Sequence, residues 1–136
     1  MKTFKLFFVA VIAIGTQISC SSQNNNQANQ DAVSQGEVTV YYFHFERRCV
    51  TCKAVEQVSR EAVAELYNGT VPFMAYNLDE PEGKEAGEKI VVSGQSLLVV
   101  KGDTKIDLTA KGFMNATTKP EELKKILKEN IDPLLQ

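Results

Sequence analysis

The chain has 136 residues, of which 43% are hydrophobic and 24% are charged, an ordinary composition for one compact domain with some additional sequence. Its formal net charge is −2, and removal of an N-terminal segment that carries Lys2 and Lys5 leaves 13 basic against 17 acidic residues. Because such a chain lacks the basic surface that phosphate backbones require, nucleic-acid binding is excluded as its main function.

The first twenty residues predict an export signal. Two lysines are followed by an apolar run over residues 6–14 that is too short to span a bilayer. Cys20, directly after the segment, resembles the lipidation site of bacterial lipoproteins, although Gln17 replaces the usual leucine three residues earlier. Lipidation of Cys20 would also leave Cys49 and Cys52 as a pair. We therefore expect a lipid-anchored protein of the bacterial cell envelope that faces the periplasm, with a soluble secreted form or an uncleaved anchor as alternatives.

Residues 21–36 consist mainly of Ser, Gln and Asn and have almost no apolar side chains. Such a segment buries too little surface to offset the entropy lost on ordering, so it is predicted to be a polar flexible tether. The composition changes at Glu37, and residues 37–136 are expected to form one globular domain. The tether would hold that domain some distance from a membrane surface.

The first half of this domain predicts a strand, a helix and a second strand. Residues 38–45 are β-branched and aromatic without strict alternation, which favours a central strand whose aromatic side chains are core. Apolar residues at three- and four-residue spacing predict a helix over 52–67, and Gly69 is expected to end it. Residues 71–78 predict the second strand, in which Pro72 favours an edge position.

The second half predicts a short polar helix over 79–92, a hairpin and a last helix. The strands of the hairpin, 96–100 and 105–108, are joined by KGDT, which has the residues of a tight turn. In the last helix Thr118 is expected to be the N-cap and Pro120 lies in the first turn. The order β-α-β-α-β-β-α implies a parallel strand pair with a right-handed crossover and an added antiparallel strand. The predicted fold class is therefore α/β, with a four-stranded mixed sheet and helices on both faces.

Cys49 and Cys52 lie where the first strand meets the first helix, in the sequence CVTC. Unpaired N–H groups and the dipole at a helix N-terminus favour an anion, and Arg47 and Arg48 directly before Cys49 add positive charge. Cys49 is therefore expected to have a lowered pKa and to be the nucleophile. Cys52, one turn into the helix, is expected to be more sheltered and to resolve a mixed disulfide.

Three other roles are open to this pair. A structural disulfide is disfavoured, because a bridge across so few residues constrains the unfolded chain very little. A metal-binding or partner-docking subunit without turnover would use Cys49, Cys52 and His44, the only histidine, and three ligands at most would require an open or shared site. A scaffold with dispensable cysteines is the third. The spacing and position favour redox chemistry over all three, so no metal site is assigned.

A C-x-x-C motif at the strand–helix junction of a β-α-β pattern resembles the thioredoxin superfamily, and the resemblance covers residues 37–132. The extra strand and helix that precede the motif in thioredoxin are missing, so the implied fold is the minimal thioredoxin-like version. The stretch VYYFHFERRCVTCKAVE also resembles small exported bacterial proteins, the ArsF-type group named as nitrophenyl compound nitroreductase subunits. The resemblance implies extracytoplasmic thiol–disulfide exchange without an organic cofactor. The implied partner is a protein disulfide or dithiol, belonging to a membrane redox donor or an enzyme subunit.

One departure from the thioredoxin pattern falls in the loop Gly94, Gln95, Ser96, which is expected to lie beside Cys49. Gln95 stands where relatives have a cis-proline. A trans peptide between Gly94 and Gln95 is expected, because a cis bond before a residue other than proline costs about 2.5–4 kcal/mol. Since the proline also helps to exclude metals in relatives, its loss favours the metal-binding alternative.

Two further departures lie in and after the first strand. Arg48 replaces the tryptophan that usually precedes the first cysteine, and Phe43 replaces a buried acid six residues before that cysteine. In thioredoxin this acid accepts a proton. His44 or Glu46 is therefore the candidate for proton transfer here, although a packed strand end for His44 and a solvated charge for Glu46 are the simpler interpretations.

Overall fold

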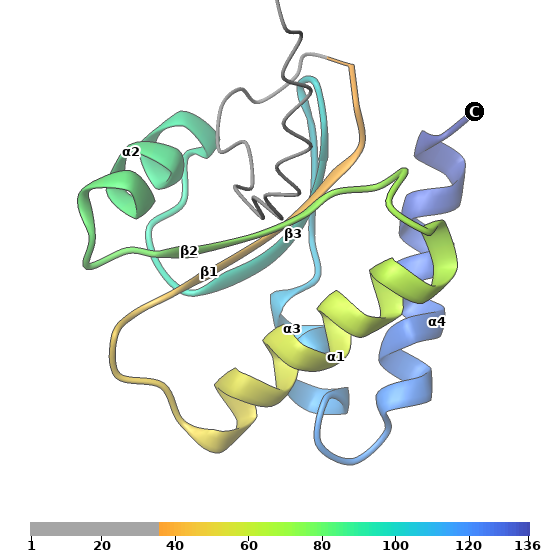
Figure 1. Ribbon diagram of the computed structural model, residues 1–136, viewed down its shortest axis with the longest axis horizontal. Helices are drawn as coiled ribbons and strands as arrows, with labels where there is room; N and C mark the ends of the chain where they lie inside the picture. Colours follow the sequence, from red (N-terminus) through yellow and green to blue (C-terminus); the bar gives the residue numbers. More distant parts are fainter. Residues whose placement is uncertain (1–35) are drawn as a thin grey trace, which may run out of the picture. The chain divides into compact units, whose positions relative to one another are not determined.

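The computed structural model describes residues 36–136 (Figure 1). The predicted export signal, the lipidation site at Cys20 and all but the last residue of the predicted tether lie outside this range and stay predictions. Among residues 36–136, no helix has the length and apolar character needed to cross a membrane.

A four-stranded mixed sheet carries the fold. Its strand order is β2-β1-β3-β4; β2 is parallel to β1, and the other two neighbouring pairs are antiparallel. The predicted hairpin and the edge position of the second strand are thereby confirmed. The elements follow the chain in the order β1 (Thr39–His44), α1 (Val50–Tyr67), β2 (Phe73–Asn77), α2 (Pro81–Ile90), β3 (Ser96–Lys101), β4 (Thr104–Asp107), α3 (Thr109–Asn115), α4 (Pro120–Ile131) and the short 3₁₀ helix η1 (Asp132–Leu134).

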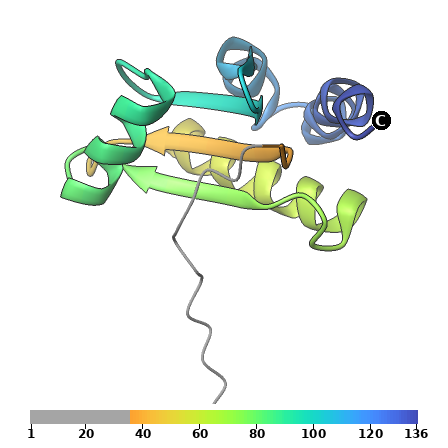
Figure 2. The same ribbon diagram turned by 90° about the horizontal axis from the view of Figure 1, so that it is seen from above.

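Helices cover both faces of the sheet, as the sequence predicted. Successive side chains of a strand point to opposite faces. Tyr42 of β1 and Leu97 of β3 therefore belong to a larger core shared with α1 and α4, whereas Phe43 and Leu98 belong to a smaller core beneath α2. Figures 1 and 2 show α1, α3 and α4 gathered together and α2 apart from them. The cysteines, at the start of α1, thus belong to the side with three helices.

The helix α3 was not predicted, because seven residues that include a glycine carry too little apolar periodicity. Packing holds α3 in place. A Cβ at Gly112 would lie 3.1 Å from a methyl carbon of Leu97 and 3.2 Å from one of Val55, so the glycine lets α3 approach the sheet and α1 closely. The predicted cap of the last helix was also wrong: the N-cap of α4 is Lys119, and the Thr118 hydroxyl donates to the Met114 carbonyl instead.

The backbone of α2 lies very close to the end of β2 at Gly83. A Cβ at Gly83 would lie 1.9 Å from the carbonyl oxygen of Asn77. At its other end, α2 stops at Val91, which has a left-handed φ of 59°. Lys105 of β4 donates its ammonium to the carbonyls of Ile90 and Val91, at 3.0 and 3.1 Å. These contacts fix the start of the loop that leads to Gln95.

Candidate active site

Cys49 is the N-cap of α1, and its Sγ accepts a hydrogen bond from the Cys52 N–H at 3.2 Å. The helix begins at Val50, two residues earlier than predicted, so the sulfur of Cys49 takes the place of the oxygen that usually satisfies an unpaired N–H at a helix start. Cys49 is exposed and Cys52 is only 7% exposed, and both are free thiols. The exposed and sheltered positions therefore agree with the prediction.

The surroundings of the Cys52 thiol lower its pKa. Burial raises the pKa of the Cys52 thiol, but hydrogen bonds with the Cys49 side chain, with the Gln95 side chain and with the backbone at the helix start together lower it by more. The net direction for Cys52 is a pKa below that of an ordinary thiol. The site thus supports one thiolate more readily than an isolated cysteine would.

A buried tyrosine forms the floor beneath Cys52. The Tyr42 side chain is fully buried, and its hydroxyl donates to the Cys52 carbonyl at 2.8 Å. The Gln95 amide nitrogen in turn donates to the Tyr42 hydroxyl at 2.6 Å. Burial raises the pKa of Tyr42 to about 12, so the hydroxyl keeps its proton at neutral pH. Tyr42 therefore links the first turn of α1 to the loop before β3.

The loop Gly94, Gln95, Ser96 faces the cysteine pair through Gln95. The Cys52 thiol donates to the Gln95 Oε1 at a sulfur–oxygen distance of 3.8 Å, and the Ser96 hydroxyl donates to the Gly94 carbonyl at 2.6 Å. No peptide bond within residues 36–136 is cis, so the expected trans geometry before Gln95 is confirmed. The amide side chain of Gln95 thus lies against Cys52, at the position to which the thioredoxin resemblance assigns a proline.

The side chain of Phe43 lies on the face of the sheet away from α1. It packs in the smaller core with Tyr41 and Ile90. Phe43, six residues before Cys49, therefore does not lie beneath α1, because one residue along a strand reverses the face. The buried polar group beneath the active-site helix is Tyr42, which the sequence indicated only as core. Strand alternation puts Tyr42 and Phe43 on opposite faces, but the aromatic run of β1 carries no signal that tells which of them faces the helix.

Comparison with solved structures identifies this architecture. A crystal structure of oxidised thioredoxin O2 from Arabidopsis thaliana matches with a TM-score of 0.50 and 22% identity, covering 69% of this chain and 75% of that one. The chain has a thioredoxin fold. Thioredoxin f2 from Chlamydomonas reinhardtii also matches, at 20% identity and a TM-score of 0.48, over 72% of this chain and 82% of its own. No protein-family model and no curated protein matches the sequence.

The two candidates for proton transfer in this thioredoxin fold are placed differently. His44, half-buried at the end of β1, has its ring 5.9 Å from that of Tyr42 and its Nδ1 3.0 Å from the Phe45 carbonyl oxygen. Glu46 is held at the start of the β2–α2 connection, where its N–H donates to Asp79 at 2.7 Å and its carboxylate accepts from the Asn77 side chain at 3.0 Å. Glu46 is therefore engaged by polar partners other than the cysteines.

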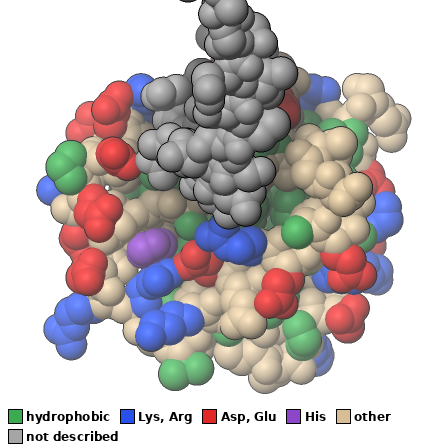
Figure 3. All heavy atoms as spheres, viewed as in Figure 1, with side chains coloured by type: hydrophobic (Ala, Val, Ile, Leu, Met, Phe, Trp, Pro, Cys, Tyr) green, Lys and Arg blue, Asp and Glu red, His purple; other side chains and the backbone are tan. Residues whose placement is uncertain are grey.

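The three ligands considered for a metal do not form a group. In the part of the chain that the structure describes, no three His, Cys, Asp or Glu side chains are placed together as a metal site requires. His44, the single histidine, reaches the surface drawn in Figure 3, where basic and acidic side chains are interspersed. Within residues 36–136, Cys49 and Cys52 would therefore offer a metal only two ligands.

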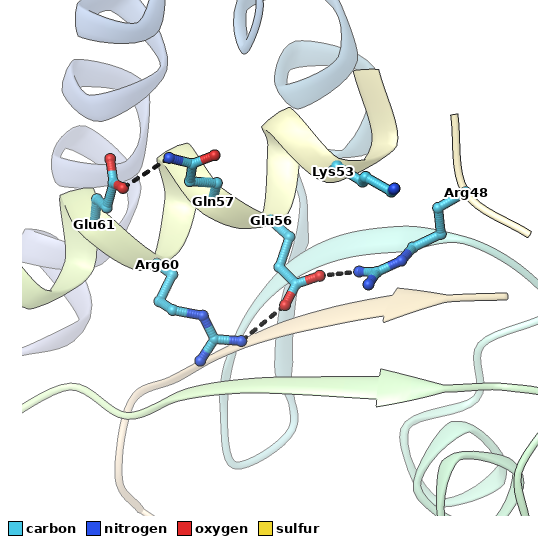
Figure 4. A pocket seen from close by; sticks show the side chains of 6 residues that line it. All are labelled: Arg48, Lys53, Glu56, Gln57, Arg60 and Glu61. Carbon is cyan, nitrogen blue, oxygen red and sulfur yellow. Dashed lines mark hydrogen bonds and ion pairs between the residues drawn. The ribbon is translucent and has the colours of Figure 1, made fainter. Parts of the chain in front are cut away.

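The two arginines before Cys49 differ in their contacts. Arg48 pairs with Glu56 of α1, and Glu56 also accepts from Arg60 at 2.9 Å. These residues line a shallow surface hollow (Figure 4). Arg47 is exposed and makes no ion pair within residues 36–136. The charge of Arg48 is thus largely offset by Glu56, and Arg47 is the less constrained of the two cations.

Removal of the Glu56 carboxylate should destabilise the domain in a pH-dependent way. Burial raises the pKa of Glu56, but Arg60 and Arg48 lower it by more, so its pKa in the folded state lies below the usual value. The carboxylate therefore stabilises the fold above the unfolded pKa, and this contribution is lost as pH falls through the folded pKa. We expect Glu56→Gln to lower the free energy of unfolding by about 1 kcal/mol at pH 7 and by almost nothing near pH 3. Urea unfolding at both pH values measures this.

The matched control is Glu85→Gln, which removes an exposed pair with Lys89 on α2. At pH 7 this control should lower the free energy of unfolding by less than Glu56→Gln does, because exposed ion pairs contribute little. If Glu56→Gln lowered the free energy of unfolding equally at both pH values, packing and not charge would be responsible.

Proposed function

We propose that this domain exchanges thiols and disulfides through Cys49 and Cys52. The observation that supports it best is the unequal placement of the two thiols in a thioredoxin fold: an exposed sulfur caps α1, and a sheltered one lies one turn inside. An exposed thiol at a helix start has the position of a nucleophile, and a sheltered neighbour has the position of a resolving group.

The reaction proceeds in two displacements. The Cys49 thiolate attacks one sulfur of a partner disulfide, forming a mixed disulfide and releasing the other partner sulfur as a thiolate, which takes up a proton. Cys52 then loses its proton, and its thiolate attacks the Cys49 sulfur. The Cys49–Cys52 disulfide forms and the second partner thiolate leaves and is protonated. Two electrons pass from the domain to the partner; the reverse sequence oxidises a partner dithiol.

The cysteine pair itself carries both electrons, so the proposal requires no organic cofactor. The partner is a protein disulfide or dithiol, belonging to a membrane redox donor or to an enzyme subunit. The enzyme subunit as partner follows from the resemblance to the ArsF-type group and is part of this proposal. We further propose that the reaction takes place outside the cytoplasm, with the domain exported, tethered by residues 21–36 and anchored to a bacterial membrane through lipid on Cys20.

Capture of the partner tests this function. Cys52→Ser removes the resolving thiol, so Cys49 should remain joined to its natural partner as a mixed disulfide that a reducing agent releases. The control is the double variant Cys49→Ser, Cys52→Ser, which should capture nothing. The proposal would be overturned by a purified chain that holds stoichiometric zinc or iron and loses it in Cys49→Ser. That result would favour the metal-binding alternative.

A further inference from the structure

Two exposed cations flank Cys49 in the chain. Arg47 lies just before it, and Lys53 lies one turn after it, where the Lys53 N–H donates to the Cys49 carbonyl at 3.1 Å. Both side chains are exposed, and within residues 36–136 neither of them forms an ion pair. Their charges are therefore open to water and to a partner that approaches the exposed sulfur of Cys49.

The surface hollow beside Cys49 has a surplus of positive charge. Arg48 and Arg60 share one carboxylate, that of Glu56, so a single anion offsets two cations. Lys53 lines the same hollow, and Figure 4 shows its ammonium on the side of Arg48, without a partner among the residues drawn. Glu61, the other acid of the hollow, lies further along α1. The first turn of the helix, nearest to the sulfur, contains no acidic residue.

The carboxylate nearest to Cys49 in the sequence, that of Glu46, is held at the end of β2 instead. The Asn77 side chain donates to Glu46 at 3.0 Å and to Glu80 at 3.2 Å, and Asp79 accepts from the Glu46 N–H at 2.7 Å. These three acids thus gather around Asn77 and not in the hollow along α1. The charged groups that remain unpaired beside the sulfur are the two cations on either side of it.

We propose that the partner of this domain is a protein whose reacting cysteine is flanked by acidic side chains, and that Arg47 and Lys53 select it. This inference names the substrate class of the proposed thiol–disulfide exchange and rests on that exchange. Charges around a site of attack raise the rate of encounter with groups of opposite sign and lower it for groups of like sign. Carboxylates beside the partner sulfur meet Arg47 and Lys53 as that sulfur reaches Cys49.

Three peptides test this preference. Each contains a single cysteine joined through a disulfide to pyridine-2-thiol, and the residues on both sides of that cysteine are Glu, Gln or Lys. In the full chain with Cys20→Ser and Cys52→Ser, Cys49 is the only thiol. Its thiolate attacks the peptide sulfur, the new disulfide forms, and pyridine-2-thiolate leaves, which is followed by ultraviolet absorbance.

The rate constant should be highest for the Glu peptide and lowest for the Lys peptide. Arg47→Gln and Lys53→Gln should each lower the ratio of the Glu to the Gln rate constant about threefold at low ionic strength, and high salt should remove most of the preference. The ratio isolates the effect of charge, because a change in the reactivity of the thiol itself affects all three peptides alike.

The matched control is Lys84→Gln, which removes an exposed lysine of α2, on the other face of the sheet, and changes the net charge by the same amount. It should leave the ratio as it is. Equal rate constants for the three peptides, or a ratio that Lys84→Gln lowers as much as Arg47→Gln does, would overturn the inference.

The reaction of a small uncharged thiol with the same peptides separates this inference from the proposed function. Equal rate constants that still exceed those of the small thiol would reject the charge preference and leave the proposed exchange in place. If Cys49 reacted with every peptide no faster than the small thiol, the proposed exchange would fail, and the preference with it.

Discussion

Replacement of Cys49 by serine is expected to reduce disulfide reduction to the uncatalysed background, whereas replacement of Cys52 should leave the first displacement intact. The reason is the exposure of the sulfurs: only Cys49 is accessible to a bulky partner, while Cys52 is 7% exposed. A serine hydroxyl at position 49 is not ionised at neutral pH and cannot replace the thiolate. With a small aromatic disulfide as substrate, Cys52→Ser should release one equivalent of the aromatic thiol rapidly and then stop.

The matched control is Cys20→Ser, which removes the cysteine outside the described domain and should keep full turnover in detergent solution. Continued turnover in Cys49→Ser would contradict the assignment of the nucleophile. A Cys52→Ser variant that turns over repeatedly would instead show that Cys52 is not needed for resolution.

Gly83→Ala is expected to cause the largest loss of stability among single-methyl additions in this domain. The added Cβ would lie 1.9 Å from the Asn77 carbonyl oxygen and 2.4 Å from its carbon, and both atoms are backbone. Relief therefore requires α2 to move away from β2, which loosens the smaller core under that helix. We expect the free energy of unfolding to fall by about 3 kcal/mol, measured by urea denaturation.

Gly94→Ala is the matched control for this substitution. A Cβ at Gly94 would meet no atom within 4 Å, so its effect on unfolding should be small. If both variants unfolded at the same urea concentration, the close approach of α2 to β2 would not limit stability.

Much of the architecture could be predicted because its patterns are local. The strand–helix junction at Cys49, the hairpin and the edge position of β2 each follow from a few neighbouring residues. The exposed and sheltered positions of the cysteines follow from the start of one helix. Turn residues, helix periodicity and capping act over short separations, so a single sequence contains them.

The floor of the site could not be predicted in the same way. Tyr42 meets Gln95 across a separation of 53 residues, and neither residue type by itself indicates the contact. The face to which Tyr42 points depends on strand register, and counting six residues back from Cys49 leads to Phe43, which lies on the other face. The helix α3 was missed for a related reason, since it is held by the fit of Gly112 against Val55 and Leu97.

The central strand of the sheet also determines when the site can form during synthesis. β1 pairs with β3 through residues such as Val40 and Val99, so its second edge stays open until the later strand has left the ribosome. The cysteines precede Gln95 in the chain, and they therefore exist for a time without the amide that faces them.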